Sequence, residues 1–348
     1  MEEPSAMSAS TSPYTPHPSE RTGAAIGNSV SHLLYQEDKR RFWSADRSAY
    51  LLYSSIAGKI VVLGDPVGTE TDGRTALTEF LSSGKASRRD YVFYRMGPRY
   101  AAWLERCGFR TMKTGEEASV ALTGFHTTGK SWIKLRTKIH KIEREGYRCE
   151  ILLPPHADAL ISEVESVSDA WLGGKREKSF SVGSYCGTYV AAHPIATLRS
   201  RGGELLAFVT LAAFERPEGE RGLAIDLMRY REGSPSGGME ALFVRILTWG
   251  QASGYAECSL GASPLANACD GRPWLNLVRR IASRYYNFEG LQRFKAKFRP
   301  QWEDRYVAYS SGSAFIALAL VALLVHRRRR NRSASQEISG TAAAQSTH

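Results

Sequence analysis

The stretch GLAIDLMRYREGSPSGGMEALFVRILTWGQASGYAECSL, residues 222–260, places two strand-like segments on either side of a helix-like one. Residues 222–228 and 256–260 are short apolar runs typical of buried strands. Residues 240–253 repeat apolar side chains at helical spacing, which is typical of an amphipathic helix. A strand, a helix and a second strand in this order predict an α/β unit.

A similar mixture of strands and helices precedes this stretch. The strands predicted in the first half of the chain are 49–53, 59–63, 91–95 and 118–122, and the helices are 75–83 and 99–107. The second half adds a helix at 157–171 and strands at 195–199 and 205–211. The segment GDPVG at 64–68 is predicted to be a turn. Strands mixed with helices in two halves of similar size predict an α/β (α+β) fold of two related halves with mixed sheets.

The composition supports real cores and indicates an anionic partner. The chain has 348 residues, of which 43% are hydrophobic and 10% aromatic, enough for two domains of ordinary size. Its formal net charge of +11 points to nucleic acid or a membrane surface as a partner. The five cysteines show no CxxC spacing and the eight histidines form no HExxH pair. Neither a disulfide framework nor a metal site is therefore predicted.

The two ends of the chain differ in character. Residues 1–28 are rich in serine, threonine, proline and alanine and predict a disordered leader. Residues 307–325 form an uncharged run, and the basic tail that follows, 327–348, is also predicted to be disordered. The segment 310–326 is predicted to associate with a membrane, either as a single anchor or as a helix lying in the membrane plane. A C-terminal helix buried on the domain is the alternative.

A basic segment, 130–146, lies between the two predicted halves. The first half is 29–150, which includes this segment, and the second is 151–309. On a helix, Lys134 and Lys138 share one face with Lys141. Such a stripe is either a solvated linker helix or a phosphate-binding surface for RNA.

Several familiar catalytic motifs are missing from the sequence. The segment 261–265 lacks the second glycine of the serine-hydrolase elbow, and there is no Walker loop or dinucleotide fingerprint after a strand. The glycine-rich segment 199–203 lies between two predicted strands, so it indicates a hairpin turn and not a phosphate loop for coenzyme A. No cofactor is predicted.

Charged side chains embedded in apolar sequence are the best candidates for chemistry. They are Asp226, Arg229, Glu240, Lys295 and Lys297, with Glu117 in the first half. Any one of them could be a buried ion pair or a helix cap, because a charge in apolar surroundings needs a partner. Together they suit transfer of an acyl group from an activated ester to an alcohol. In that reaction carboxylates orient the nucleophile and cations stabilise the oxyanion.

Ten short segments occur in an order that indicates a family. They are GDPVG (64–68), GEEA (115–118), LR (135–136), REGY (144–147), WLGGK (171–175), DLMR (226–229), LG (260–261), SPL (263–265), YNF (286–288) and KF (297–298). From about Phe42 to Tyr309, about three quarters of its length, the chain resembles the catalytic domain of the multiple peptide resistance factor family. The members of this family are aminoacyl-phosphatidylglycerol synthases.

The resemblance implies a tandem GNAT-like fold, with the active site between two related halves. It implies transfer of an aminoacyl group, lysyl or alanyl, from aminoacyl-tRNA to the hydroxyl of phosphatidylglycerol, without coenzyme A or a metal. The catalytic residues it implies are Asp226, Arg229, Glu240 and Lys297, and the substrate-binding residues are Glu117, Arg136, Ser263 and Lys295. Glu240 departs from the family pattern, which has aspartate after the methionine, but it keeps the carboxylate.

The resemblance also implies a location. Aminoacyl-tRNA is cytosolic, so we expect a membrane-associated enzyme with its catalytic domain in the cytosol. A spanning segment would place residues 327–330 outside, against the positive-inside tendency, which favours a helix lying in the membrane plane. Larger family members carry many transmembrane helices before this domain. None is found here, so the expectation is a chain that makes the lipid without flipping it.

Two alternatives stay open. One is an aminoacyl-tRNA-dependent transferase with a sterol or another lipid as acceptor. The other is a non-catalytic domain that binds tRNA or anionic lipid.

Overall fold

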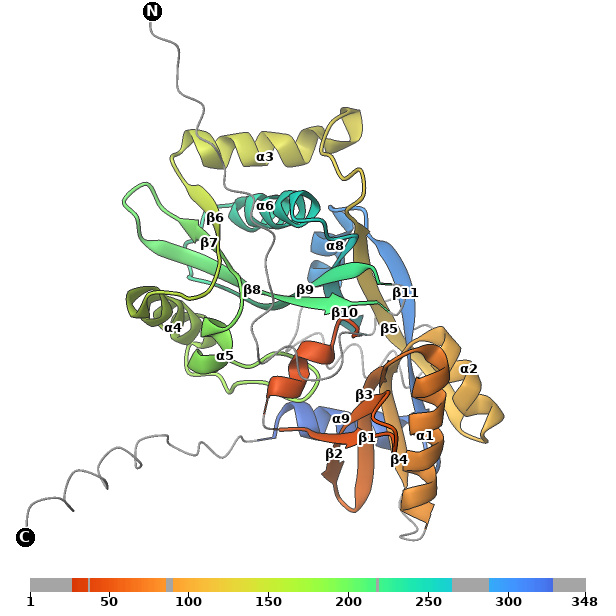
Figure 1. Cartoon of the computed structure of the whole chain (residues 1–348). Helices are drawn as coiled ribbons and strands as arrows, with labels where there is room; N and C mark the ends of the chain where they lie inside the picture. The colour runs from red at the N-terminus through yellow and green to blue at the C-terminus, as the bar shows by residue number, and fades with distance from the viewer. Residues whose placement is uncertain (1–26, 37, 86–89, 217–218, 265–287, 328–348) are drawn as a thin grey trace, which may run out of the picture.

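Within the residues that the computed structural model describes, which are 27–36, 38–85, 90–216, 219–264 and 288–327, eleven strands form one sheet (Figure 1). The strands of the first half are β1 (Arg40–Trp43), β2 (Tyr50–Ile56), β3 (Lys59–Val67), β4 (Tyr91–Met96) and β5 (Arg110–Ala121). Those of the second half are β6 (Arg148–Leu152), β7 (Ile195–Arg199), β8 (Leu205–Glu215), β9 (Arg221–Tyr230), β10 (Glu257–Pro264) and β11 (Gln301–Tyr309). Their order across the sheet is β1-β2-β3-β4-β11-β5-β10-β9-β8-β7-β6.

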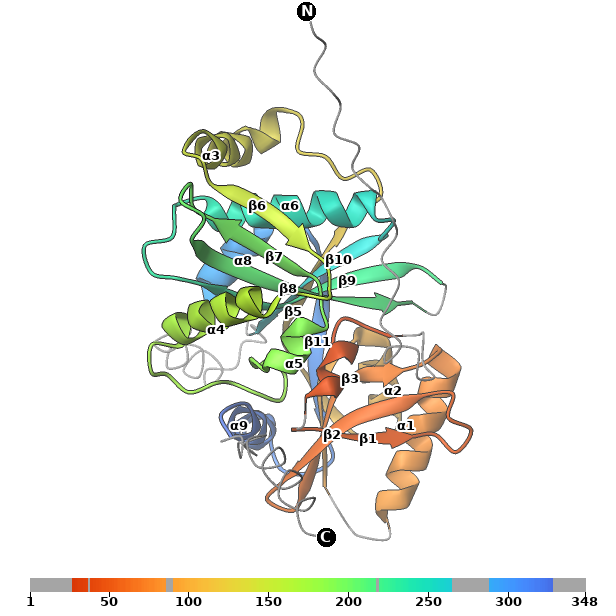
Figure 2. The same ribbon diagram turned by 60° about the vertical axis from the view of Figure 1, so that its left-hand side comes forward.

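Helices cover both faces of this sheet, as Figure 1 and Figure 2 show. The first half carries η2 (Ser31–Tyr35), α1 (Glu70–Lys85) and α2 (Pro98–Arg106). The basic segment between the halves carries η3 (Lys130–Trp132) and α3 (Ile133–Arg144). The second half carries α4 (Asp158–Leu172), α5 (Gly187–Ala191), α6 (Gly238–Ala252) and α8 (Phe288–Ala296), and α9 (Ala314–Val325) follows β11. Along the strands of the second half, α3 and α6 lie on one side of the sheet, and α4 and α5 lie on the other (Figure 2).

The two halves repeat one topology and exchange their last strand. In the first half α1 connects the parallel strands β3 and β4, and in the second half α6 connects the parallel strands β9 and β10. Each parallel pair is followed by a helix and one more strand, α2 and β5 in the first half and α8 and β11 in the second. β11 pairs with β4 and β5, whereas β5 pairs with β11 and β10. The predicted α/β fold of two related halves with mixed sheets is confirmed.

The parallel strands β9 and β10 are paired only at their beginnings. Within the described residues, their pairing covers Gly222, Leu223 and Ala224 of β9 and goes no further. β9 nevertheless continues to Tyr230 and β10 to Pro264. The two strands therefore separate at the point where several of the predicted site residues lie.

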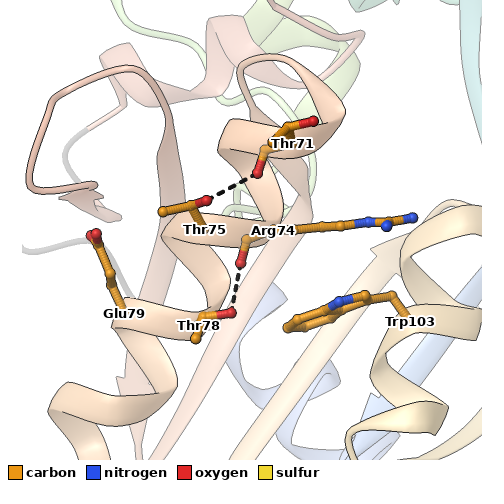
Figure 3. Close-up of a pocket in the computed structure, with 6 residues that line it drawn as sticks. All are labelled: Thr71, Arg74, Thr75, Thr78, Glu79 and Trp103. Carbon is orange, nitrogen blue, oxygen red and sulfur yellow. Dashed lines mark hydrogen bonds between the residues drawn. The ribbon is translucent and has the colours of Figure 1, made fainter.

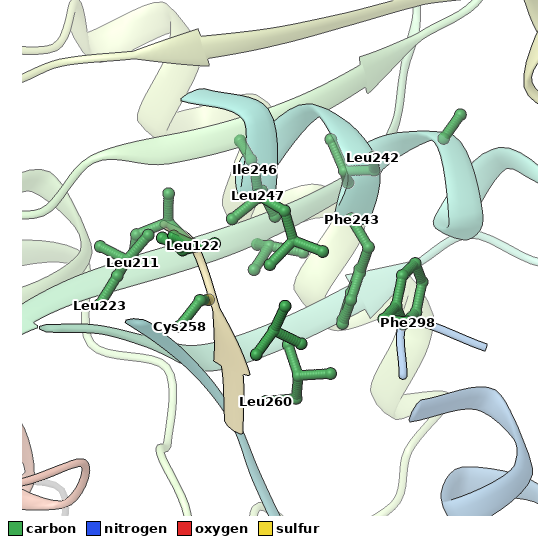
Figure 4. Packing of buried hydrophobic residues seen from close by; sticks show 14 of the residues in the cluster. Leu122, Leu211, Leu223, Leu242, Phe243, Ile246, Leu247, Cys258, Leu260 and Phe298 are labelled. Atoms are coloured by element: carbon green, nitrogen blue, oxygen red, sulfur yellow. The ribbon is translucent and has the colours of Figure 1, made fainter. Parts of the chain in front are cut away.

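A large hydrophobic core fixes these two strands against α6 (Figure 4). The helix contributes the apolar face that its sequence spacing predicts, including Leu242, Phe243, Ile246 and Leu247. They pack on side chains from the sheet and from the segment after α8, among them Leu211, Leu223, Cys258, Leu260 and Phe298. Full burial of one such leucine or phenylalanine contributes about 1.5–3 kcal/mol. The core therefore holds the separating ends of β9 and β10 in a defined position.

The turn predicted at 64–68 is wrong, because these residues continue β3 up to Val67. Gly64 has a φ of +69°, and a β carbon there would lie 2.6 Å from Cγ2 of Val30. Glycine is needed at this position both for the positive φ and for the close approach of Val30. It marks an irregularity in the pairing of β2 with β3, and not the end of a strand.

The uncharged run at 307–325 is divided between two elements. Its first three residues end β11, and α9 has twelve residues. One face of α9, which includes Leu320 and Leu324, is buried in the core of the first half. None of the described helices is both long and apolar enough to cross a membrane. The predicted leader and tail, apart from 27–28 and Arg327, lie outside the described residues.

Candidate active site

A β-bulge in β9 brings Asp226 and Arg229 to the same face of the sheet. Residues three apart in a regular strand point to opposite faces. Here two successive residues of β9, Asp226 and Leu227, oppose the single residue Thr210 of β8. As a result Asp226 reaches α5 and Arg229 reaches α4, and both helices cover the same side of the sheet.

Asp226 is buried and both of its carboxylate oxygens have partners. Oδ1 lies 3.2 Å from Nε2 of His32, and Oδ2 accepts hydrogen bonds from the Tyr189 hydroxyl at 2.9 Å and from Thr210 at 3.4 Å. Burial alone would raise the pKa of Asp226, but the contacts with His32 and Tyr189 hold it below its usual range. The carboxylate is therefore ionised near neutral pH. A β carbon on Gly183 would lie 2.1 Å from Oδ1, so only glycine fits beside it.

Arg229 is also buried, and its partners are protein groups. Its Nη1 donates to the Ser168 hydroxyl at 2.5 Å, its Nη2 forms an ion pair with Glu177, and its guanidinium lies 5.1 Å from the ring centroid of Trp171. The same oxygen of Glu177 accepts a hydrogen bond from the backbone N–H of Tyr185 at 2.6 Å. Arg229 thus fixes the loop after α4 in place.

A second cluster is centred on Glu117 of β5. Its carboxylate accepts hydrogen bonds from Arg95 at 3.1 Å, Arg305 at 3.0 Å and Ser259 at 2.8 Å, and also from Ser29. Burial alone would raise the pKa of Glu117, but the charges of Arg305 and Arg95 hold it well below its usual range. Arg95 has a φ of +64° at an irregularity in β4, which aims its side chain at this carboxylate.

Lys295 and Ser263 lie beside this second cluster. Nζ of Lys295 donates to the carbonyl oxygens of Gly261 at 2.9 Å and Ala262 at 2.8 Å, and Ala262 pairs with Glu117 in the sheet. Burial lowers the pKa of Lys295 to about 7. The hydroxyl of Ser263 is buried and has no hydrogen-bond partner among the described residues. The end of β10 therefore offers polar groups that the protein itself does not fully satisfy.

A third cluster brings Glu240 and Lys297 together, but not with Asp226. Oε1 of Glu240 accepts hydrogen bonds from Lys138 of α3 at 2.8 Å and from Lys297 at 2.9 Å. Burial alone would raise the pKa of Glu240, but the bonds from Lys138 and Lys297 lower it. The carboxylate joins α3 and the segment after α8 to the first turn of α6.

Arg136 lies on α3, where it holds the preceding loop. Its Nη1 donates to the carbonyl oxygens of Thr127 at 2.5 Å and Gly129 at 2.9 Å. The predicted basic helix is present, and Lys134 and Lys141 on it are exposed. The structure therefore separates the basic surface of α3 from the buried groups of β9 and β10.

The segment before β1 links the first two clusters. Ser29 contacts Glu117, while His32, three residues later on η2, contacts Asp226. The side-chain amide of Gln36 donates to the carbonyl oxygen of Ser184, and the Ser184 hydroxyl donates to Oε1 of Gln36. These two hydrogen bonds hold the segment against the loop after α4. This one segment therefore contacts both Asp226 and Glu117.

The loop after α4 makes the second link. Glu177 binds Arg229, and the carbonyl oxygen of Ser181 accepts a hydrogen bond from Arg95 at 3.2 Å. Gly183 lies against Asp226. Sequence reasoning missed this loop and His32, because neither carries a charge within an apolar run. The segment WLGGK at 171–175, just before Glu177, was the signal nearest to the loop.

Other features of the described residues do not add to this site. No group of three or more histidine, cysteine, aspartate or glutamate side chains within them could hold a metal ion. An open hollow of about 340 Å³ between α1 and α2 is lined by Thr71, Arg74, Thr75, Thr78, Glu79 and Trp103 (Figure 3). It holds none of the predicted site residues. Residue 265 and the pair 286–287 of the family segments lie outside the described residues.

Comparisons with known proteins agree with the resemblance seen in the sequence. The family model described as phosphatidylglycerol lysyltransferase, C-terminal, matches residues 20–309. The phosphatidylglycerol lysyltransferase of Bacillus subtilis (strain 168) is 37% identical over 314 residues, which are 88% of this chain and 36% of that protein. The enzyme of the same name from Staphylococcus xylosus is 32% identical over 311 residues, which are 87% of this chain and 36% of that protein. The chain thus spans a little over a third of these relatives.

Solved structures share the fold. The structure of L-PGS from Bacillus licheniformis is 37% identical and has a TM-score of 0.77, covering 87% of this chain and 94% of that one. The crystal structure of FemX, at 9% identity and a TM-score of 0.54, covers 85% of this chain and 95% of that one, and shares the fold alone. The resemblance is confirmed: the chain belongs to the phosphatidylglycerol lysyltransferase family and corresponds to its C-terminal domain.

Proposed function

We propose that this domain transfers an aminoacyl group, lysyl or alanyl, from aminoacyl-tRNA to the hydroxyl of phosphatidylglycerol at the cytosolic face of a membrane. The observation that carries the proposal is a pair of buried polar clusters at the separating strands β9 and β10, which the segment before β1 links. The pair holds an ionised carboxylate, Asp226, and a buried amine with a lowered pKa, Lys295. Family membership supports the choice of reaction, because the relatives are named as phosphatidylglycerol lysyltransferases.

The site contains the groups that transfer of an acyl group requires. The attacking hydroxyl must lose a proton, and the ester carbonyl must carry negative charge in the transition state. Lys295 and the Ser263 hydroxyl, at the end of β10, stabilise that negative charge. Lys295 has three N–H donors when charged, and two carbonyl oxygens occupy two of them. Arg229 positions the loop that closes on Asp226, because it is bound to Glu177.

The basic surface of α3 is the proposed contact for tRNA phosphates. Lys134 and Lys141 are exposed on this helix, and Arg144 lies in its last turn. Cations spaced along a helix bind phosphate groups without reading sequence. Lys138 is directed to Glu240 instead, and so ties the basic helix to the body of the domain.

The outer face of α9 supports placement at a membrane. Ile316 and Leu323 on this face are 45% and 59% exposed. Arg327 follows the helix, and the sequence continues with three more arginines at 328–330. An apolar face beside a cluster of cations suits the interface of an anionic bilayer.

The proposal is tested by lipid mass spectrometry on cells that express the chain, compared with cells that express Asp226→Asn. The wild-type chain should yield aminoacylated phosphatidylglycerol, and the variant should lose at least about 99% of that product, as expected when the negative charge that supports proton transfer is removed. Far-ultraviolet circular dichroism controls for folding of the variant. An aminoacylated neutral lipid would assign the acceptor to another class. No aminoacylated lipid, despite folded protein, would rule the function out.

A further inference from the structure

His32 is placed like a general base that a carboxylate holds in position. It lies on the short helix η2, is 8% exposed, and presents Nε2 to Oδ1 of Asp226 at 3.2 Å. In the neutral imidazole, a proton on Nε2 makes the hydrogen bond to this carboxylate, and the lone pair is then on Nδ1. A histidine oriented by a buried carboxylate is the arrangement that accepts a proton from a hydroxyl nucleophile.

Asp226 is poorly placed to accept that proton itself. Its Oδ1 contacts His32, and its Oδ2 already receives the hydroxyls of Tyr189 and Thr210. These contacts lower the pKa of the carboxyl, which weakens it as a base. Three protein donors therefore occupy most of the roughly four acceptor sites of this carboxylate, which leaves little of it for a substrate hydroxyl.

Nδ1 of His32, in contrast, is available. Among the described residues, Nδ1 has no hydrogen-bond partner. It is also absent from the set of unpartnered side-chain atoms that are closed off from solvent. Nδ1 is therefore free of protein partners within the described part of the chain and not fully closed off from solvent. The rest of η2 is anchored independently of the imidazole, because Val30 and Leu33 are buried in the core of the first half.

We propose that His32 is the general base of the aminoacyl transfer and that Asp226 orients it and stabilises its protonated form. This proposal rests on the proposed function. The hydroxyl oxygen of the lipid glycerol attacks the carbonyl carbon of the aminoacyl ester, and its proton passes to Nδ1 of His32. The new C–O bond forms as the carbonyl becomes an oxyanion. When the oxyanion collapses, the bond to the ribose oxygen of tRNA breaks. That oxygen takes the proton back from His32, so no proton is gained or lost overall.

The test compares His32→Gln with His156→Gln in the purified full chain. His156 is a matched control, because it is a partly buried histidine whose Nε2 contacts a backbone carbonyl, that of His193, at 2.8 Å. With aminoacyl-tRNA and phosphatidylglycerol in detergent micelles, His32→Gln should lower kcat by about 10²–10⁴-fold, the usual contribution of a general base. KM for tRNA should change little. His156→Gln should stay within about twofold of wild type.

A second variant separates a base from a structural residue. In His32→Ala, added imidazole should restore part of kcat, because it can occupy the space of the missing ring and accept the proton. Asp226→Asn should show no such rescue. If His32→Gln keeps more than a tenth of wild-type kcat, or if imidazole fails to rescue a folded His32→Ala, the assignment of His32 is wrong. If the wild-type chain itself makes no aminoacyl lipid, the proposed function fails, and the role of His32 fails with it.

Discussion

At the scale of single residues, two lysines bind Glu240 at nearly equal distances and with nearly equal exposure to solvent. Lys138 and Lys297 lie 2.8 Å and 2.9 Å from the same oxygen, and their side chains are 43% and 41% exposed. Loss of either lysine leaves Glu240 paired with the other, so the two truncations should cost similar stability. The family resemblance gives a catalytic role to Lys297 alone. Comparison of the two alanine variants therefore separates an ion pair from a substrate contact.

We expect Lys297→Ala to lower kcat/KM for aminoacyl transfer by about 10²-fold or more, as for loss of one group that stabilises a transition-state charge. Lys138→Ala should lower it by no more than about threefold, because an exposed ion pair contributes only about 0.2–1 kcal/mol. Steady-state kinetics on both purified variants measures the difference. Equal losses of activity in the two would show that Lys297 acts through Glu240 and not on the substrate.

Lys295 gives a prediction for the pH dependence of stability. Burial lowers its pKa to about 7 from an ordinary value of 10.5. Between these two pH values the unfolded chain binds more protons than the folded one, so the contribution of Lys295 to the free energy of unfolding rises with pH, by at most about 1.4 kcal/mol per pH unit. In Lys295→Met this rise should disappear. Urea unfolding of both proteins at pH 7 and pH 9 measures it, and an unchanged difference between the two pH values would contradict a buried, perturbed amine.

The sequence indicated many of the residues of the site, but not which of them lie together in the structure. Asp226 and Arg229, three apart, share a face only because β9 contains a bulge opposite Thr210. Glu240 and Lys297 meet on the other side of the sheet, with Lys138 as a third partner. No strand or helix was predicted around His32, and its contact with Asp226 depends on packing across 194 positions of sequence. Bulges and long-range packing are set by tertiary structure, which local patterns do not encode.

At the scale of elements, α9 combines a buried face with an outer face that remains apolar. Leu320 and Leu324 are in the core of the first half, whereas Ile316 and Leu323 are exposed. The end of the helix is held to the loop after α4, because the backbone N–H of Ser179 donates to the carbonyl oxygen of Val325 at 2.9 Å. The same loop carries Glu177 and Gly183 into the candidate active site. Binding of α9 to a bilayer would therefore place the site near lipid headgroups.

The double variant Ile316→Ser with Leu323→Ser should sediment much less with vesicles of phosphatidylserine and phosphatidylcholine than the wild-type chain. These vesicles lack the proposed substrate, so they report on the surface of α9 and not on the active site. Loss of two apolar side chains that would enter the bilayer should weaken partition by about 10²-fold, at roughly 1.5 kcal/mol each. Leu153→Ser, which alters an exposed leucine just after β6, is the matched control. Equal sedimentation of the double variant and the wild type would exclude α9 as the membrane contact.

Among elements, the sequence predicted interior strands and amphipathic helices better than edges and irregular strands. The runs at 59–63, 91–95 and 222–228 correspond to β3, β4 and β9, because strands covered on both faces are nearly continuous in apolar residues. β1 and β6, at the two edges of the sheet, carry mixed polar and apolar residues and gave no signal. The segment 64–68 has the composition of a turn, yet Gly64 lets the chain continue as a strand.

At the scale of the whole molecule, the exchange of final strands ties the two halves into one folding unit. β11, the last of the described strands, lies between β4 and β5 of the first half. β5 in turn completes the second half by pairing with β10 along seven registered positions, 115–121. No cut between the halves can preserve both sets of backbone hydrogen bonds, and unpaired strand edges favour aggregation.

We therefore expect fragments that end at residue 150 or begin at residue 151 to fail to fold separately. The first would lack the strand that joins β4 to β5, and the second would carry β11 without either of its partners. Mixing the two should restore a folded sheet, because all pairings are then present. Chemical denaturation followed by circular dichroism is the measurement: each fragment alone should show no cooperative transition, and the mixture should show one. A cooperative transition in either isolated fragment would mean that its half has a core sufficient without the exchanged strand, and that the halves are independent domains.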